Sequence, residues 1–458
     1  MDLNSIHNMY FLGIGGIGMS SLARYFHAKG KTVAGYDLTP SPITQDLEQI
    51  GIKIHYRARI GDVPQHMLDR SNTLVILTPA VPGDHEELVY FRKNNFTIRK
   101  RAELLGMLFN ARKGIAVAGT HGKTSVTSMS AFILSSSEQG CTAFLGGILK
   151  NNNSNLITND NSPWVVAEAD EYDRSFLHLH PDIALVTWID ADHLDIYSTA
   201  EAIQDSFDRF MEQVKAGGTV ILKNNIKPGC DLSGKKVVTY ALDDPSADFH
   251  ASNIRLNQYK YVVDVDTPGE TIQNIQLQYP GITNVENAVA AAAVAYTAGV
   301  DPAVIGKALA DFQGVQRRFD IQYKDQDCVY IDDYAHHPRE LDAIIGSVRK
   351  LFPGKKITGI FQPHLFSRTR DFAREFAQSL SSLDELILLD IYPAREIPIA
   401  GVSSKIIFDQ VKIGKKQLCP KEKLLDLLRK KPVEILLTMG AGDIDRFVDP
   451  IKKLIASR

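Results

Sequence analysis

Two glycine-rich segments of the sequence have the residue types and spacing of phosphate-binding loops. The second, "GTHGKTS", follows the apolar run 114–118 and precedes a helical pattern, so its N–H groups would converge on an anion at a helix N-terminus. Lys123 would reach the β- and γ-phosphates of ATP, and the Thr124 hydroxyl would bind Mg²⁺. A strict P-loop has glycine where this chain has Val117. The strand, loop and helix context still predicts an ATP site made of Gly119, Thr120, His121, Gly122, Lys123, Thr124 and Ser125.

The first glycine-rich segment lies near the N-terminus and matches the pattern G-x-G-x-x-G. It would let a pyrophosphate approach the backbone at the start of a helix, and Asp37, at the end of the next apolar run, could accept a hydrogen bond from a ribose hydroxyl. NAD and a UDP-type ligand both fit this pattern, as does tight packing without a ligand. Because an ATP loop follows in the same chain, we expect a UDP-sugar, bound by Gly13, Gly15, Gly16, Gly18, Met19 and Asp37.

Acidic residues recur where two apolar runs end. They occur in "VVAEADEYD" as Glu168, Asp170, Glu171 and Asp173, and in "TWIDADHLD" as Asp190, Asp192, His193 and Asp195. The carboxyl ends of strands in an open α/β sheet are where ligands bind, and carboxylate oxygens suit Mg²⁺. Either cluster alone is also typical of helix caps and turns. Together with the ATP loop they favour a metal-phosphate site.

The last third of the chain has polar clusters at the ends of further apolar runs. "GVQRRFD" offers Arg317 and Arg318, where a guanidinium could stabilise charge on a transferring phosphoryl group, although a solvated basic pair is equally compatible. "DDYAHHP" and "FQPHLFSRTR" contain Asp332, Asp333, His336, His337, His364, Arg368 and Arg370. A single histidine is more often structural than catalytic, but these clusters lie where substrates would bind.

The elements that position these residues follow an α/β pattern. Apolar runs alternate with helical patterns, as in a parallel sheet with crossover helices. We predict an N-terminal Rossmann-like domain at 1–107, a central P-loop ATPase-type domain at 108–314, and a C-terminal Rossmann-like domain at 315–458. Residues 248–280 alternate apolar and polar side chains, which predicts an antiparallel insertion in the central domain. The biased segment 150–162 is predicted to be a loop.

Composition narrows the function classes. The 458 residues carry a formal net charge of −3 without a basic stripe, so nucleic acid is not an expected partner. The four cysteines show no metal-binding or disulfide spacing. The N-terminus lacks the pattern of a signal peptide, and no apolar run is long enough to span a bilayer. We therefore expect a cytoplasmic enzyme without a membrane partner, acting as a monomer or a homodimer.

Seven segments spread over most of the chain resemble, in order, the motifs of the Mur ligases of peptidoglycan synthesis. They are "GTHGKT", "EADEYDRSFLHLHP", "DADHLD", "GVQRRFD", "DDYAHHP", "FQPHLFSRTRDF" and "LLTMGAGDID". The resemblance implies three domains, which bind a UDP-sugar, ATP and an amino acid, respectively. It implies an amide ligase that activates the carboxylate of UDP-N-acetylmuramate with ATP and Mg²⁺ and joins L-alanine to it. The C-terminal domain is expected to close over the acyl-phosphate intermediate.

The resemblance also implies roles for individual residues. Lys123 matches the phosphate-binding lysine, Thr124 and Glu168 match ligands of one Mg²⁺, and His193 matches a ligand of a second. Three further groups match. Asn284 and Asn287 match the residues that contact adenine, and Arg318 and Asp333 match residues of the central and C-terminal domains that close on ATP. The residues that match the substrate-binding segments are Tyr334, His336, His364 and Arg368. The expected catalytic set is Lys123, His193, Arg318, His336 and Arg368, with His336 as a candidate base.

The chain departs from the family pattern in two places. Thr283 stands where a histidine usually precedes the asparagine pair, which leaves one nucleotide contact open. No lysine lies between Leu194 and Val214, where several relatives carry a carbamylated lysine, as expected of the alanine-adding branch. The alternatives are a recycling ligase that adds a tripeptide to the same nucleotide, and a sensor that binds UDP-sugar and ATP without catalysis. A nicotinamide dehydrogenase is disfavoured by the ATP loop.

Overall fold

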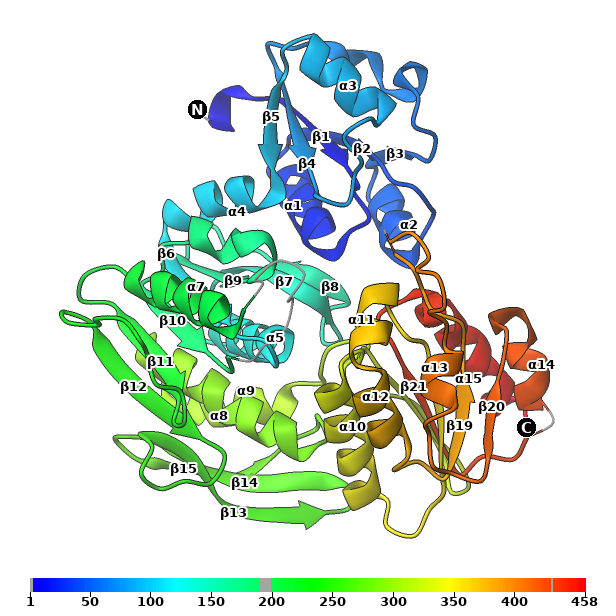
Figure 1. Cartoon of the computed structure of the whole chain (residues 1–458). Helices are drawn as coiled ribbons and strands as arrows, with labels where there is room; N and C mark the ends of the chain where they lie inside the picture. The colour runs from blue at the N-terminus through cyan, green and yellow to red at the C-terminus, as the bar shows by residue number, and fades with distance from the viewer. Residues whose placement is uncertain (1–2, 190–198, 395, 430) are drawn as a thin grey trace. The chain divides into compact units, whose positions relative to one another are not determined.

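The structure is a computed structural model that describes residues 3–189, 199–394, 396–429 and 431–458 (Figure 1). The chain forms two compact units. The first comprises Met1–Ile254, Val262–Leu277 and Glu286–Gln313, and the second comprises Arg255–Tyr261, Gln278–Val285 and Gly314–Arg458. Strands in the described ranges form three sheets: the N-terminal sheet and most of the central sheet belong to the first unit, and the third sheet belongs to the second.

The N-terminal sheet is parallel, with the order β3-β2-β1-β4-β5. Its strands are β1 (Asn8–Leu12), β2 (Thr32–Tyr36), β3 (Lys53–His55), β4 (Thr73–Leu77) and β5 (Thr97–Lys100). Alternate side chains of β1 face opposite sides, because side chains in a strand repeat every second residue. Met9 and Phe11 pack with α1 (Ile17–Ala28) and α4 (Arg101–Asn110), whereas Tyr10 and Leu12 pack with α3 (Glu86–Lys93). The remaining elements are α2 (Pro42–Gln49) and the 3₁₀ turns Leu3–Ser5, Ile60–Asp62 and Gln65–Leu68.

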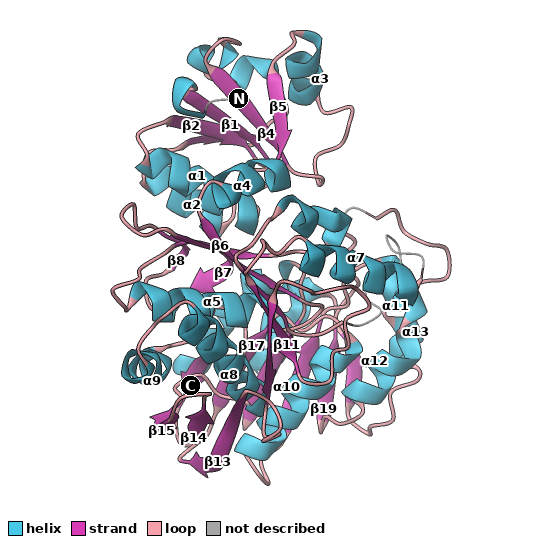
Figure 2. Ribbon diagram, turned by 90° about the vertical axis from the view of Figure 1, so that its left-hand side faces the viewer, coloured by secondary structure: helices cyan, strands magenta, loops and turns pink. Residues whose placement is uncertain are grey.

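The central sheet has the order β15-β14-β13-β12-β11-β10-β6-β9-β7-β8. Its strands are β6 (Lys113–Ala118), β7 (Thr142–Leu149), β8 (Ser154–Ile157), β9 (Trp164–Glu168), β10 (Ile183–Val186), β11 (Thr219–Lys223), β12 (Lys236–Ala241), β13 (Phe249–Asn257), β14 (Lys260–Asp266) and β15 (Thr271–Gln276). The helices are α5 (Lys123–Ser135), α7 (Ala200–Glu212), α8 (Ile282–Thr297) and α9 (Pro302–Asp311), with the 3₁₀ turn η4 (Tyr172–His178). Helix α5 packs against β7 and β9, and Figure 2 shows α5 beside β7.

Two expectations for the central sheet have different outcomes. Strands β14 and β15 pair antiparallel, which confirms the predicted insertion. The prediction of a loop throughout 150–162 is wrong, because β8 lies inside it and pairs antiparallel with β7. Buried Asn155 explains the strand's polar composition, because its Nδ2 donates to Ile17 O at 2.7 Å and to Ser20 Oγ at 2.9 Å.

The sheet of the second unit has the order β16-β17-β21-β18-β19-β20, and only the β16–β17 pair is antiparallel. The strands are β16 (Asp320–Lys324), β17 (Val329–Asp333), β18 (Ile357–Phe361), β19 (Glu385–Leu388), β20 (Lys416–Leu418) and β21 (Ile435–Met439). The helices are α10 (Pro338–Leu351), α11 (Phe366–Asp371), α12 (Ala373–Leu380), α13 (Lys405–Phe408), α14 (Leu424–Arg429) and α15 (Val448–Ala456), with 3₁₀ turns at Lys421–Lys423 and Asp443–Phe447.

The predicted fold class is confirmed: the chain has Rossmann-like N- and C-terminal parts and a central α/β part with an antiparallel addition. The domain boundaries at residues 107 and 314 stay a prediction. None of the helices in the described ranges is long and apolar enough to cross a membrane.

Candidate active site

The backbone of the ATP loop depends on two glycines. Gly119 follows β6 with φ of 129°, and a Cβ there would lie 2.1 Å from Thr187 Oγ1. Gly122 is the N-cap of α5 with φ of 80°, a left-handed conformation that costs other residues energy. A Cβ on Gly122 would lie 2.9 Å from Asn287 Oδ1. The loop therefore turns sharply from β6 into α5 and passes close to α8.

Lys123, the first residue of α5, lies within this loop and is already engaged. Its Nζ donates to Gly119 O at 2.6 Å and lies 2.7 Å from Glu171 Oε2, and the Glu171 side chain is only 2% exposed. Burial lowers the pKa of Lys123, but the carboxylates of Glu171, Asp170 and Glu168 outweigh it and the net pKa is raised. Lys123 therefore stays an ammonium ion, as phosphate binding requires.

Thr124 and Glu168 lie together beside the ATP loop. The Thr124 hydroxyl donates to Glu168 Oε2 at 2.9 Å. Strand β7 makes room for this carboxylate with Gly146, where a Cβ would lie 1.9 Å from Glu168 Oε2. The Thr120 hydroxyl in the same loop is buried and has no hydrogen-bond partner in the part of the chain that the structure describes. A hydroxyl beside a carboxylate offers hard oxygen ligands, so these residues fit Mg²⁺.

The second predicted metal position is not described. His193 lies outside the described residues, as do Asp190, Asp192 and Asp195. Within the described ranges, no group of three or more His, Cys, Asp or Glu side chains is placed to hold a metal ion. The remaining ATP-loop residues surround Lys123: Ser125 is buried and His121 is half-buried.

The predicted adenine contacts both lie on α8. Asn284 and Asn287 are one turn apart and are 7% and 8% exposed. The Asn284 amide donates to Pro280 O at 2.6 Å. Asn287 lies beside Gly122, as the 2.9 Å approach to a Cβ there shows, so the structure brings it to the ATP loop.

The first glycine loop lies between β1 and α1. Gly13 has φ of 85°, and its N–H donates to Tyr36 O at 2.8 Å. The Gly15 N–H donates to Asp37 Oδ2 at 2.7 Å, so Asp37 stabilises the loop in addition to any ribose contact. Gly16 is the N-cap of α1 and has no side chain with which to cap it.

The Met19 side chain is packed inside the fold. It is 1% exposed in the hydrophobic core, and the Met19 N–H donates to Gly16 O at 3.0 Å. Both groups are used within the fold, and a contact of Met19 with the nucleotide stays a prediction.

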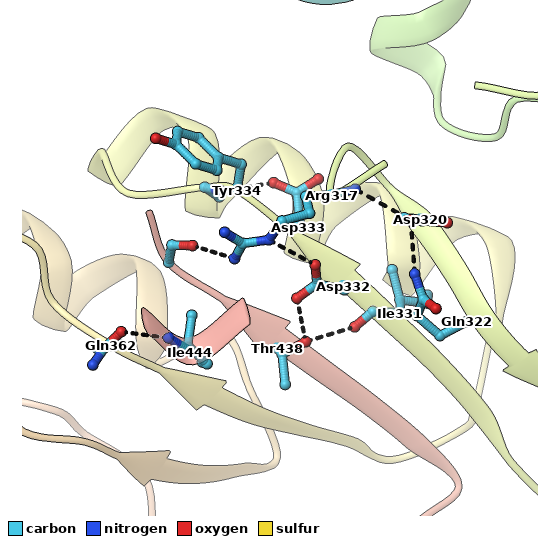
Figure 3. Close-up of polar contacts among 12 residues, drawn as sticks. Arg317, Asp320, Gln322, Ile331, Asp332, Asp333, Tyr334, Gln362, Thr438 and Ile444 are labelled. Atoms are coloured by element: carbon cyan, nitrogen blue, oxygen red, sulfur yellow. Dashed lines mark hydrogen bonds and ion pairs between the residues drawn. The ribbon is translucent and has the colours of Figure 1, made fainter. Parts of the chain in front are cut away.

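The structure separates the roles of two adjacent arginines in the second unit, and Figure 3 shows the first of them, Arg317, with Asp332. The Arg317 Nε lies 3.1 Å from Asp332 Oδ2, and its Nη2 donates to Gly440 O at 2.6 Å. Asp332 has a fully buried side chain and also accepts from Thr438 Oγ1 at 2.6 Å. Arg317 is therefore structural. Arg318 is half-buried, with its guanidinium carbon 4.8 Å from the centre of the Tyr334 ring.

Asp333 stabilises the same segment. Its Oδ2 accepts from Phe319 N–H at 2.6 Å and its Oδ1 from Ala335 N–H at 2.8 Å. Burial raises the pKa of Asp333 to about 6, although these two hydrogen bonds favour the carboxylate. In this structure Asp333 holds the backbone that carries Arg318 and Tyr334.

Three of the predicted substrate residues, Tyr334, His336 and His364, form an aromatic group after the ends of β17 and β18. His336 Nδ1 lies 3.0 Å from Tyr334 O and 3.3 Å from Glu340 Oε2. Because a carbonyl oxygen only accepts, Nδ1 carries a proton, and in the neutral ring Nε2 is then the basic nitrogen. The ring centre of His364 is 5.9 Å from that of His336.

Arg368 lies on α11 and is 9% exposed. The loop before it is set by Leu365, which has φ of 70° and donates its N–H to Tyr392 O at 3.0 Å. Ser367 N–H donates to Glu396 Oε2 at 2.9 Å. The segment "FQPHLFSRTR" is thus hydrogen-bonded to the loop after β19, with His364 just before α11 and Arg368 on it.

Sequence reasoning placed Glu171 in an acidic cluster but did not assign it to Lys123, and it missed Gly146. The close spacing of Glu168 and Glu171 indicated that Glu171 also lies near the ATP loop. The sequence carried no local signal for Gly146, because its neighbour Glu168 lies on another strand.

Known proteins resemble the chain along nearly its whole length. Three family models match in succession: the Mur ligase family catalytic domain at residues 8–113, the Mur ligase middle domain at 117–295, and the Mur ligase glutamate ligase domain at 317–442. A UDP-N-acetylmuramate–L-alanine ligase of Parabacteroides distasonis is 50% identical, covering 100% of this chain and 99% of the relative. The ligase of the same name from Phocaeicola vulgatus is 49% identical, covering 99% of each chain.

Solved structures agree with these matches. The crystal structure of the UDP-N-acetylmuramate-alanine ligase of Thermotoga maritima has a TM-score of 0.83 and 28% identity, covering 98% of this chain and all of the other. A murein peptide ligase of Psychrobacter arcticus has a TM-score of 0.73 and 23% identity over 98% of each chain, which is a likeness of fold. The chain therefore belongs to the Mur ligase family of ATP-dependent ligases.

Proposed function

We propose that this enzyme joins L-alanine to the carboxylate of UDP-N-acetylmuramate, with cleavage of ATP to ADP and phosphate, in the synthesis of peptidoglycan precursors. The observation that carries the proposal is the pair Thr124 and Glu168 beside Lys123, in the same compact unit as the first glycine loop. One unit thereby holds a loop for each nucleotide. The relatives that are about half identical over the full chain have this activity in their names.

The first step forms an acyl phosphate. A carboxylate oxygen of UDP-N-acetylmuramate attacks the γ-phosphorus of ATP, the bond to the β-γ bridging oxygen breaks, and ADP leaves. The two reactants are anions that repel each other, so the Lys123 ammonium has to neutralise the phosphates. Arg318 is the further cation that we assign to the transferring phosphoryl group.

Mg²⁺ would be held by Thr124 and Glu168, with His193 for a second ion, and it supplies positive charge that stabilises the phosphates. We assign the phosphates to the N–H groups of the Gly119–Ser125 loop and the orientation of the base to Asn287, which lies beside Gly122. We assign the diphosphate of the UDP-sugar to the loop formed by Gly13, Gly15, Gly16 and Gly18, with Asp37 on the ribose.

The second step forms the amide. The neutral amine of L-alanine attacks the acyl carbon, a tetrahedral oxyanion forms, and phosphate leaves as the carbonyl re-forms. The amine must lose a proton, and we assign its uptake to Nε2 of His336, which is the basic nitrogen of the neutral ring when Nδ1–H donates to Tyr334 O. His364, Arg368 and Tyr334 would bind the amino acid and the muramoyl group.

The test is ATP-dependent phosphate release with Mg²⁺ and UDP-N-acetylmuramate. The acceptors to compare are L-alanine, the tripeptide L-alanyl-γ-D-glutamyl-diaminopimelate, and none. Release that requires L-alanine supports the proposal. Release only with the tripeptide would assign the chain to the recycling activity, and no release with either acceptor would favour a nucleotide sensor.

The proposal includes the setting of the reaction. UDP-N-acetylmuramate and L-alanine are small molecules, so neither a membrane nor a nucleic acid takes part, and the enzyme works in the cytoplasm as a monomer or a homodimer. Sedimentation of the purified chain distinguishes the two states.

A further inference from the structure

One arginine that has no role in the site described above lies against the first glycine loop. Arg101 is the first residue of α4. A Cβ on Gly18 would lie 2.8 Å from Arg101 Nη1 and 3.1 Å from its Cδ. Any side chain at position 18 would therefore displace the guanidinium. The third glycine of the motif makes room for Arg101 in the first turn of α1.

The other side of the guanidinium faces the ATP site. Arg101 Nη2 lies 3.8 Å from Asp170 Oδ2, and the two side chains are 22% and 39% exposed. Asp170 is flanked by Glu168 and Glu171, which contact Thr124 and Lys123. Arg101 thus lies between the glycine loop and the acidic residues that follow β9 beside the ATP loop.

The fold holds Arg101 in this place. Helices α1 and α4 pack on the same face of the N-terminal sheet, in one core that includes Leu22 and Leu104. The start of α4 is capped by Glu103, which accepts from Lys100 N–H at 3.1 Å. The start of α1 is tied to β8 through Asn155. The distance between the glycine loop and the Arg101 backbone is therefore set by packed elements.

We propose that Arg101 binds the diphosphate of the nucleotide sugar at Gly18, exchanging Asp170 for phosphate oxygens; this rests on the proposed function. A partly exposed ion pair with one 3.8 Å contact is weak. A diphosphate can accept two parallel N–H bonds from the same guanidinium, which is the stronger geometry. Arg101 would hold the diphosphate end of the substrate and direct the carboxylate end toward ATP.

The experiment compares Arg101→Ala, Arg101→Lys and the control Arg92→Ala. Arg92 is exposed on α3, which packs on the opposite face of the sheet, so its removal changes the net charge equally without touching the loop. Two quantities are measured: the Kd of UDP alone by calorimetry, and the KM values for UDP-N-acetylmuramate and ATP. Thermal unfolding checks that each variant is folded.

We expect Arg101→Ala to raise both the Kd of UDP and the KM of UDP-N-acetylmuramate by about 10- to 100-fold. The KM of ATP should change little. Arg101→Lys should retain part of the affinity because it keeps the charge but loses the paired donors. Unchanged UDP affinity in Arg101→Ala would overturn the diphosphate assignment, even if the KM of the full substrate rose. An equal loss in Arg92→Ala would also overturn it.

The UDP measurement does not depend on catalysis. If the wild-type chain released no phosphate with L-alanine, the proposed function would fail, and the comparison of UDP affinities would still decide the role of Arg101.

Discussion

The ammonium group of Lys123 lies 2.7 Å from the carboxylate of Glu171, and both side chains are largely buried. The pair keeps the lysine charged and in place inside the ATP loop before any nucleotide is bound. The same pair stabilises the loop, so a substitution of Lys123 is expected to lower both the activity and the stability. The two effects have to be measured separately.

Lys123→Ala is expected to lower the rate of phosphate release at least about 100-fold, because a charge that stabilises the transferring phosphoryl group is lost. It should also lower the Tm, since Glu171 becomes a buried carboxylate without its ammonium partner. The double variant Lys123→Ala/Glu171→Gln should recover most of the Tm and none of the activity. Recovery of activity together with the Tm would contradict the catalytic role.

Gly122→Ala is expected to raise the KM of ATP at least about tenfold, because the new Cβ meets Asn287 Oδ1 at 2.9 Å and shifts the loop. The left-handed φ of 80° adds about 1–2 kcal/mol of strain. Gly217→Ala is the matched control, because Gly217 has φ of 74° and no atom within 4 Å of its would-be Cβ. Both variants should lose stability. If Gly217→Ala changed the KM of ATP as much as Gly122→Ala does, the proposed loop geometry would be contradicted.

Glu87 should make the stability of the N-terminal part depend on pH. Its carboxylate accepts from the Tyr10 hydroxyl at 2.5 Å, and burial raises its pKa to about 7 from 4.5. The folded chain then binds the proton more tightly than the unfolded chain, so this contribution is complete below pH 4.5 and is lost as the pH rises through 7. The loss is at most about 3 kcal/mol.

Urea unfolding of wild type and Glu87→Gln between pH 5 and pH 8 measures this contribution. His55 Nε2 lies 3.6 Å from Glu87, and burial lowers the pKa of His55, which gives a slope of opposite sign in both proteins. The difference between the two proteins isolates Glu87. Parallel curves would show that Glu87 does not titrate in this range.

Asp332→Ala is expected to destabilise the second unit by about 3–5 kcal/mol, because it leaves the Arg317 guanidinium without its buried partner. Asp332→Asn should cost less, since an amide oxygen can still accept from Arg317 and Thr438. Activity should fall with Asp332→Ala, because Arg318 follows Arg317 directly and depends on its position. Calorimetry should show the shift in the transition of the second unit, and an unchanged transition would contradict the structural role of Arg317.

Part of this site could be predicted because its determinants are local. The turn from β6 through Gly119 and Gly122 into α5 requires an apolar run, glycines and a helical pattern within one stretch of sequence. The same holds for the first glycine loop between β1 and α1, and for the strand ends that carry Asp333 and His364. The prediction of a loop at 150–162 was wrong because β8 forms by pairing with β7, and its Asn155 is buried where it donates a hydrogen bond to α1. The composition of the segment indicates neither contact.

The sequence by itself determined the order of the α/β parts, the two phosphate loops and the family, because strand, loop and helix signals act over short distances and need only neighbouring residues. Only the tertiary structure decided which charges meet. Lys123 and Glu171 are 48 residues apart, and Gly18 and Arg101 come from different helices. Arg317 and Arg318 are adjacent and both lie over the ring of Tyr334, yet the pairing of β17 with β21 brings Asp332 and Gly440 to Arg317. Such contacts result from packing and strand register, which depend on the whole fold.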